Sequence, residues 1–514
     1  MQRAVGRSIT SILVFALLIG TAWTGRASVA RQGVDPALHA GDVALIQVAT
    51  DTAWTVAADL TSAGATDVIA FDSVNVVSAR LSDQALATLA TDRAVLRATT
   101  DARVAAVGGG GNGKDLDKVG SASTKDSIGI EAINAAAAWS LTTGASVVVA
   151  LMDSGISAHP DLPSGKVIAR VDLANDGALG LDPAGHGTHL AGIIAGHGTT
   201  FRGVAPDALL VDIRVLDASG QGTLRSVVAG FDWLLKNRTA LRIRVLNLSF
   251  GTTQTSSYHT DLLSALAESA WFAGVTVVAA AGNEGSDGGT ISTPGTDPFI
   301  ITAGSFDDQG TPSGQDDCES AFSSRGPTLD GFAKPDVLAP GRRVVSLRAA
   351  GSQIAPVVPG HGAAQGGTSS SSLYTRMSGT SVSSAMVSGV AALVLSFHTS
   401  YTPTNTKGAI LASGRGITGT PTRAVMAPSA VSALPRVVNS QLLPSRLLMT
   451  ALQKRGLVGS GTTWEGVTWE GVTWERVMWE TVTWEGVSWE SVSWEGVAWE
   501  RVNVTQHSAQ GGSR

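Results

Sequence analysis

Cysteine is nearly absent from this chain, which has a single one, Cys318, among 514 residues. A lone cysteine cannot form an intrachain disulfide or a multi-cysteine zinc site. Its neighbours include Asp317 and Glu319, and acidic neighbours raise the pKa of a thiol, which disfavours the reactive thiolate. We therefore expect Cys318 to be structural.

An excess of positive charge is also missing, because the formal net charge is −6. We expect no nucleic-acid partner, since proteins that bind nucleic acids carry basic patches. Long apolar runs are scarce too. After the N-terminal region no run approaches the roughly 20 apolar residues that a membrane-spanning helix needs, so we expect the mature protein to be soluble.

The first 30 residues are typical of a secretory signal. Arg3 and Arg7 make a positive start, an apolar run follows at 9–22, and small residues at 27–30 offer a cleavage site. We predict that residues 1–30 are a signal peptide and that the protein is secreted and extracellular. The alternative is an uncleaved membrane anchor, for which the apolar run is short.

Residues 31–103 predict a small α/β domain. Its apolar and polar patterns follow the order strand, helix, strand, strand, helix, strand, which is the split βαβ arrangement. The expected ranges are 42–49, 51–63, 67–74, 75–81, 82–92 and 94–99. A linker at 104–125, with four consecutive glycines, separates this domain from a larger one.

Residues 126–450 predict a larger α/β domain. Continuous apolar runs, such as 146–152 and 275–280, are typical of buried parallel strands. Helix-like stretches, such as 261–272, lie between them. Strands that alternate with helices favour a doubly wound, mostly parallel sheet, which binds ligands beyond the carboxyl ends of its strands.

The tail at 451–514 contains a five-residue repeat, Trp-Glu-x-Val-Thr/Ser. On a helix this period scatters the Trp side chains around the axis, and in a strand it alternates them between faces. A β-type repeat and a disordered stalk are both open interpretations. One hypothesis is attachment to a partner, a polysaccharide or a cell surface. The other is a tail that packs on its own protein or is clipped during maturation.

Four residues carry the chemistry. Asp153 follows a buried strand, His186 lies between two glycines, Ser381 precedes an apolar helical pattern, and Asn283 follows another strand. A serine nucleophile needs a base, and the base needs an orienting carboxylate. Taken singly, each residue has an ordinary explanation as a turn or cap residue, and His186 with His189 could be a metal pair. Together, in the chain order Asp, His, Ser, they indicate the subtilisin type of triad.

The segments around these residues resemble the signature blocks of subtilases, and two further segments resemble bacterial subtilases of the AprX-like type. The former are Met-Asp-Ser-Gly (152–155), Gly-His-Gly-Thr-His (185–189), Ala-Gly-Asn-Glu-Gly (281–285) and Gly-Thr-Ser (379–381). The latter are Ser-Ser-Arg-Gly-Pro (323–327) and Lys-Pro-Asp-Val-Leu-Ala-Pro-Gly (334–341).

The resemblance implies a role for each catalytic residue. Asp153 would orient His186, which would be the general base and then the acid. Ser381 would be the nucleophile, and Asn283 would form an oxyanion hole with the Ser381 backbone N–H. The resemblance also implies substrate-binding residues. They are Ser249, Phe250 and Gly251 on a strand that pairs with an extended peptide, and Ala280, Ala281 and Gly282 in the pocket before the scissile bond. Small residues in that pocket predict room for a large apolar side chain.

Residues 31–103 resemble the inhibitory propeptide of the family in size, position and element order. The resemblance implies a zymogen that cuts itself between Arg103 and Lys125, with its own propeptide as inhibitor. Its substrates would be proteins or peptides, and we expect a monomer. We expect no cofactor or metal in the chemistry. A structural calcium ion occurs in the family, but the loop at 196–203 is short and lacks carboxylates, so we expect the usual calcium site to be absent.

The sequence therefore predicts a secreted serine endopeptidase made as a self-processed zymogen. The alternative is a catalytically inactive subtilase that binds a surface through the Trp repeat. The presence of all four catalytic residues favours the enzyme.

Overall fold

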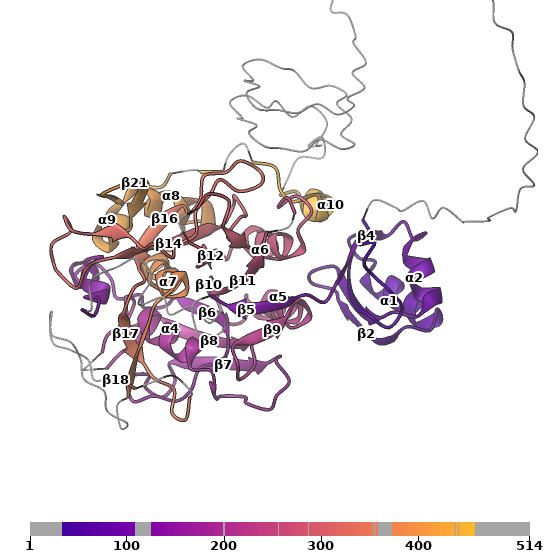
Figure 1. Ribbon diagram of the computed structural model, residues 1–514, viewed down its shortest axis with the longest axis horizontal. Coiled ribbons are helices and arrows are strands. Elements are labelled where there is room, and N and C mark those ends of the chain that lie inside the picture. The colour runs from indigo at the N-terminus through magenta and orange to yellow at the C-terminus, as the bar shows by residue number, and fades with distance from the viewer. Residues whose placement is uncertain are drawn as a thin grey trace, which may run out of the picture.

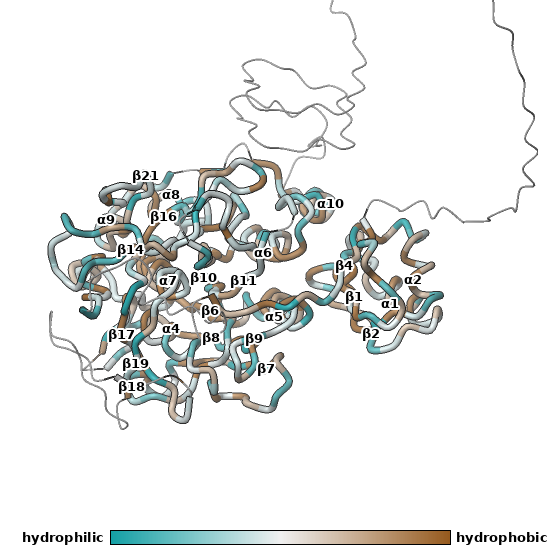
Figure 2. The backbone as a smooth tube through the Cα atoms, in the orientation of Figure 1, coloured by the Kyte–Doolittle hydropathy of each residue, from teal (hydrophilic) through white to brown (hydrophobic). Residues whose placement is uncertain are grey.

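The computed structural model describes most of the two predicted domains. It covers residues 33–107, 125–198, 201–254, 256–285, 287–352, 354, 356–357, 373–436, 438–439 and 442–457. The predicted signal peptide, the glycine run of the linker and the Trp repeat lie outside the described residues. Figure 1 shows a small unit joined to a larger one by strand β5. Hydrophobic stretches run through both, because each has its own core (Figure 2).

The small unit is a four-stranded antiparallel sheet with strand order β2-β3-β1-β4. Its elements follow the predicted order: β1 (Val43–Val48), α1 (Ala53–Ser62), β2 (Thr66–Phe71), β3 (Val76–Arg80), α2 (Asp83–Leu89) and β4 (Val95–Thr100). The predicted start of helix α2 is Ser82, which is its N-cap and accepts a hydrogen bond from Ala85 N. The N-cap of α1 is Thr52, one residue after the expected start, because Asp51 has a left-handed φ of 68°.

The two faces of this sheet pack against different partners because side chains alternate along a strand. Ile46 and Val77 lie in the small core beneath α1 and α2. Leu45 and Val76 point the other way and join the core of the larger unit. The small unit is therefore attached to the larger one through an apolar face, in addition to its chain connection.

The larger unit is built on a ten-stranded sheet whose main path runs β20-β21-β16-β14-β12-β10-β6-β8-β7. All neighbours along this path are parallel except the pair β20 and β21, and the short strand β15 (Cys318–Glu319) runs antiparallel to β14. The prediction of a mostly parallel α/β sheet is thus confirmed. The strands are β6 (Val148–Asp153), β7 (Val167–Asp172), β8 (Leu209–Arg214), β10 (Ile243–Leu248), β12 (Thr276–Ala280), β14 (Ile301–Asp307), β16 (Val337–Pro340), β20 (Arg415–Ile417) and β21 (Thr420–Ala424).

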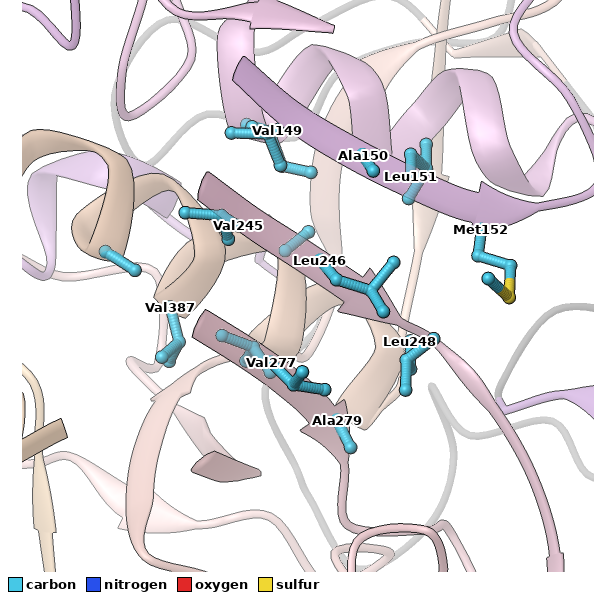
Figure 3. Close-up of a cluster of buried hydrophobic side chains, with 14 of the residues drawn as sticks. Val149, Ala150, Leu151, Met152, Val245, Leu246, Leu248, Val277, Ala279 and Val387 are labelled. Carbon is cyan, nitrogen blue, oxygen red and sulfur yellow. The ribbon is translucent and has the colours of Figure 1, made fainter. Parts of the chain in front are cut away.

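Helices cover this sheet. α4 and α7 pack against each other; α7 contacts β10, β12 and β14, and α4 contacts β6. Figure 3 shows Val387 of α7 beside the apolar side chains of β10 and β12. The helices of the unit are α3 (Ala135–Ala138), α4 (His186–Ala195), α5 (Leu224–Asn237), α6 (Leu262–Phe272), α7 (Thr380–Phe397), α8 (Pro403–Ala412), α9 (Ala427–Ser432) and α10 (Arg446–Lys454).

Two small sheets complete the larger unit. One has the strand order β13-β11-β5-β9 and the other the order β17-β19-β18. Their strands are β5 (Arg103–Ala106), β9 (Gln221–Thr223), β11 (Phe250–Thr253), β13 (Ser292–Thr293), β17 (Val344–Leu347), β18 (Pro356–Val357) and β19 (Tyr374–Met377). Strand β5 thus links the small unit directly to a sheet of the larger one.

Among the described residues one helix, α7, has the length and apolarity to cross a membrane, and 89% of it is buried inside the protein. Its apolarity is explained by its position in the core.

Close packing of α7 predicts an unusual response to alanine. A Cβ atom on Gly389 would lie 2.5 Å from Val204 Cβ. Alanine normally stabilises a helix by about 1 kcal/mol over glycine. We nevertheless expect Gly389→Ala to lower the free energy of unfolding by about 1–3 kcal/mol, because the core would be overpacked. Urea unfolding in a Ser381→Ala background, which excludes self-cleavage, measures this.

The matched control is Gly416→Ala, since a Cβ atom there would meet no described atom within 4 Å. This variant should unfold within about 0.5 kcal/mol of its parent, as exposed substitutions usually do. Equal stabilities of the two variants would contradict the close packing of α7.

Candidate active site

Three elements bring the predicted triad residues to one edge of the large sheet. Asp153 is the last residue of β6, His186 is the first of α4, and Ser381 is the second of α7. Each side chain is almost completely buried. The N-termini of two helices and the carboxyl end of a strand therefore meet at one point.

Asp153 and His186 form a close pair. Asp153 Oδ1 lies 2.7 Å from His186 Nδ1, and Ser154 N donates to the same oxygen at 2.8 Å. With Nδ1–H donating to the carboxylate, Nε2 is the unprotonated nitrogen of the neutral ring. His186 Nε2 is buried and has no hydrogen-bond partner among the described residues. The free nitrogen is thus available to accept a proton.

The electrostatic surroundings favour a protonated His186. Burial lowers the pKa of the imidazole, but the charge of Asp153, the hydrogen bond to Asp153 and the charge of Asp182 together outweigh it, so the pKa is raised above 6.5. His189, one turn along α4, behaves differently. Burial lowers its pKa to about 3, and its Nε2 lies 3.1 Å from Val344 O. His189 is therefore a neutral core residue that contacts the backbone of β17.

Asp182 is a site residue that the sequence did not reveal. Its carboxylate accepts hydrogen bonds from Gly185 N at 2.8 Å, Thr188 N at 2.7 Å and Ser154 Oγ at 2.8 Å. It thereby ties the start of α4 to the loop that follows Asp153. A carboxylate four residues before His186 is the one sequence signal that could have indicated it.

Ser381 stands at the start of α7 after Gly379, whose φ of 151° and ψ of 158° suit glycine. The Ser381 N–H is one of the first N–H groups of the helix, which have no acceptor within it. The Ser381 hydroxyl contacts the carbonyl oxygen of Val107 and lies 3.1 Å from Ser249 O. Among the described contacts no hydrogen bond joins it to His186.

Asn283 is held with its amide donor free. Its Oδ1 accepts hydrogen bonds from Thr380 N at 2.9 Å and from Thr380 Oγ1 at 3.1 Å. Because both donors occupy the oxygen, the NH₂ group must point the other way. Asn283 Nδ2 is buried without a hydrogen-bond partner among the described residues. Beside the Ser381 N–H, it can hold an oxyanion.

The predicted substrate strand is occupied by the protein's own chain. Phe250 pairs with Ala106 and Gly251 with Ala105 in antiparallel β11 and β5. The carbonyl of Ser249 accepts a hydrogen bond from Val107 N at 2.9 Å, whereas its hydroxyl is buried against Ser384 Oγ at 2.8 Å. Ser249 thus binds the segment that follows β5 through its backbone carbonyl.

A second binding strand was missed by the sequence analysis. β9 pairs with the other edge of β5, with Val104 opposite Gly222 and Ala105 opposite Gln221. The segment is polar and glycine-rich, so no apolar alternation marks it as a strand.

The pocket residues end strand β12 and lead to Asn283. Ala280 and Ala281 are buried, and Gly282 N lies 3.0 Å from Thr380 Oγ1. This contact brings the predicted pocket residues next to Thr380, the first residue of α7.

The described residues contain no group of three or more His, Cys, Asp or Glu side chains that could hold a metal ion. Cys318 lies on the surface on β15. Partial desolvation of its sulfur, followed by the charge of Asp307, raises the pKa of the thiol. The thiol is therefore protonated and poorly reactive at neutral pH.

Comparison with known proteins agrees with this geometry. The sequence profile of the Subtilase family matches residues 144–432, more than half of the chain. Serine protease AprX of Bacillus subtilis (strain 168) is 39% identical over 274 residues, which are 52% of this chain and 60% of AprX. Subtilisin DY of Bacillus licheniformis is 34% identical over 258 residues, covering 49% of this chain and 78% of that protein. The chain thus spans about 60% of the length of AprX.

The crystal structure of fervidolysin from Fervidobacterium pennivorans, a keratinolytic enzyme related to subtilisin, has a similar fold. The TM-score is 0.59, with 24% sequence identity over 77% of this chain and 61% of that one.

The Asp153–His186 pair predicts a measurable shift in the pKa of His186. In the Ser381→Ala protein, the pKa of His186 should lie above 6.5, because the two carboxylates stabilise the imidazolium. Asp153→Asn removes the larger of these charges and leaves the burial that lowers the pKa, so the pKa should fall. Titration followed by NMR of ¹⁵N-labelled histidines measures both values.

His189 is the internal control, since it should stay neutral down to about pH 4 in both proteins. An unchanged His186 pKa in Asp153→Asn would show that the Asp153 carboxylate does not raise the pKa of the imidazole.

Proposed function

The chain belongs to the subtilase family, and from this premise we propose that it is a serine endopeptidase, exported and made as a zymogen that processes itself. Asp153, His186 and Ser381 are the proposed triad, and Asn283 is the proposed oxyanion donor. The substrates are proteins or peptides that bind as an extended strand between β9 and β11.

In the proposed reaction Ser381 Oγ attacks the substrate carbonyl carbon while its proton passes to His186 Nε2. The carbonyl oxygen becomes an oxyanion held by Asn283 Nδ2 and the Ser381 N–H. The C–N bond then breaks, and His186 gives the proton to the departing amine. Water, deprotonated by His186, hydrolyses the acyl-enzyme and restores the serine. His186 Nε2 and Asn283 Nδ2 are both buried without a hydrogen-bond partner among the described residues, and this reaction uses both of them.

The contact between Ser381 Oγ and the carbonyl of Val107 is the observation that carries the proposal. A peptide of the chain lies where a substrate must lie, with its backbone paired on both sides. A binding protein without chemistry would not need a serine hydroxyl directed at that carbonyl. No feature of the described residues favours the inactive alternative, whose Trp repeat lies outside them.

The small unit supports a zymogen because it is docked firmly. Lys236 on α5 pairs with Asp72 at 2.6 Å, and Asp232 on the same helix accepts from Ser73 N at 3.0 Å. Asp101 accepts from Arg225 N at 2.8 Å, at the start of α5. With β5 in the cleft, this unit blocks access for other substrates. Export is proposed from the composition of residues 1–30.

The direct test compares wild type with Ser381→Ala, both expressed with export. Wild type should release the small unit and then hydrolyse casein, whereas Ser381→Ala should keep the small unit attached and leave casein intact, because it has no nucleophile. Gel mobility and release of acid-soluble peptides measure this. Processing of Ser381→Ala at the wild-type rate would contradict the proposal.

Asn283→Ala should retain the fold and lose about 10²–10³-fold in the rate of peptide hydrolysis, a size taken from the equivalent donor in a subtilisin. The reason is that Asn283 Nδ2 would stabilise the oxyanion and little else. The control is Asn237→Ala, a half-buried residue at the C-terminal end of α5, which should hydrolyse the same peptide at the wild-type rate. Equal rates for both variants would remove Asn283 from the oxyanion hole.

A further inference from the structure

We infer that the self-cleavage bond is Val107–Gly108, and that the enzyme prefers peptides with a small aliphatic residue before the scissile bond and an aliphatic residue three positions earlier. This inference rests on the proposed function and makes it specific. The sequence placed the cut only between Arg103 and Lys125, a range of more than twenty bonds.

The backbone register points to Val107. Ala106 N donates to Gly220 O at 3.0 Å, and Val107 N donates to Ser249 O at 2.9 Å, so the chain stays paired up to the triad. The next group along the chain, the carbonyl of Val107, contacts Ser381 Oγ. An antiparallel strand fixes the position of every carbonyl once two hydrogen bonds are set. The carbonyl presented to the nucleophile is therefore that of Val107.

A shift of the strand by one residue would be costly. Val104 and Ala106 are 1% and 3% exposed, whereas Arg103 is exposed and Ala105 is half-buried. A one-residue slip exchanges the two faces of a strand. A slip that presents Ala106 to Ser381 would bury the Arg103 charge in the apolar cluster that now contains Val104. The opposite slip, which presents the residue after Val107, would move Val104 out of that cluster to the exposed position of Arg103. Both slipped registers are thus disfavoured.

The upstream end of β5 is anchored as well. Only Asp101 and Ala102 separate β4 from β5, and both bind the start of α5: Ala102 O accepts from Leu224 N at 2.8 Å and Asp101 from Arg225 N. β4 belongs to the docked sheet of the small unit. The distance from this anchor to Ser381 therefore selects the residue that reaches the nucleophile.

The side chains in the cleft define the substrate class. Val104, Ala106 and Val107 are all small or branched aliphatics, and each is less than a tenth exposed. Burial without a polar partner favours apolar side chains and opposes charged ones by a large factor. The fourth and first residues before the cut should therefore be aliphatic, and the third, at the half-buried Ala105, should be variable.

The proposed pocket beside position 107 has little free space near its glycines. Gly251 lies on β11, which pairs with β5, and Gly282 precedes Asn283. A Cβ on Gly251 would come within 3.2 Å of Ser292 Cβ, and one on Gly282 within 2.6 Å of Ser292 Oγ, so Ser292 lies close to both glycines. Ser292 is thus the proposed floor of this pocket. The small wall residues had predicted room for a large apolar side chain, but this floor favours valine or alanine.

The first experiment maps both ends of the cut by mass spectrometry during early self-processing of the full chain. The released small unit should end at Val107, and the larger fragment should begin at Gly108. Later trimming of the larger fragment cannot alter the end of the small unit. A small unit that ends elsewhere, with an active enzyme, overturns the inference but not the proposed function. If the wild-type chain is no more cleaved than Ser381→Ala, the inference and the proposed function are both overturned.

The second experiment uses Val104→Asp and Val107→Asp, with Ala105→Asp as the matched control. The first two should slow self-cleavage at Val107–Gly108 by at least about 100-fold, because a charge would be buried without a partner. Ala105→Asp should change the rate by less than about 3-fold, as expected for a partly exposed site. Equal effects at 104 and 105 would overturn the register.

Peptide substrates keep the inference testable if a variant does not fold. Mature wild-type enzyme should cleave a fluorogenic peptide ending in Val-Ala-Ala-Val at least about 10-fold faster, in kcat/KM, than one ending in Val-Ala-Ala-Phe. Ser292→Gly should narrow this ratio by raising kcat/KM for the Val-Ala-Ala-Phe peptide, because it opens the pocket floor. Preference of the wild type for Phe would overturn the proposed pocket floor.

Discussion

Parallel pairing of β6, β10 and β12 is the constraint on which the rest of the molecule depends. Parallel strands end at the same edge of a sheet, so Asp153, Ser249 and Asn283 lie near one another although they are far apart in the sequence. The helices that return along the sheet begin at this edge too, which places His186 and Ser381 there. The candidate site is therefore a consequence of topology, and each residue needs only to stand at the end of its own element.

Buried polar groups are costly unless they are paired, and this site pairs them selectively. Asp153 binds Ser154 N and His186, and Asn283 Oδ1 is occupied by Thr380. These bonds orient the side chains, and they leave His186 Nε2 and Asn283 Nδ2 free. The hydrogen bonds at His186 Nδ1 and Asn283 Oδ1 hold His186 Nε2 and Asn283 Nδ2 in position. Little reorganisation is therefore needed when charge develops in a transition state.

Strand β5 links the stability of the small unit to the state of the site. It completes a sheet between β9 and β11, and the same segment carries the carbonyl that contacts Ser381. The apolar face of the small unit and its ion pair with Lys236 hold this strand in place. The proposed inhibition and the proposed self-cleavage thus rest on one geometry, because the segment that lies between β9 and β11 also carries the carbonyl that contacts Ser381.

The sequence by itself indicated the buried strands of the large sheet, such as 146–152 and 275–280, and the identity of the four candidate residues. Runs such as 146–152 are apolar throughout because the strand is buried on both faces, and motifs around Asp153, His186, Ser381 and Asn283 are local. Tertiary structure decided what depends on contacts between distant segments. β9 is a strand only because β5 lies beside it, and Asp182 matters only because α4 folds next to the loop after β6. The position of Ser292 close to Gly251 and Gly282 and the register of Val107 likewise depend on packing between distant segments, which no local pattern records.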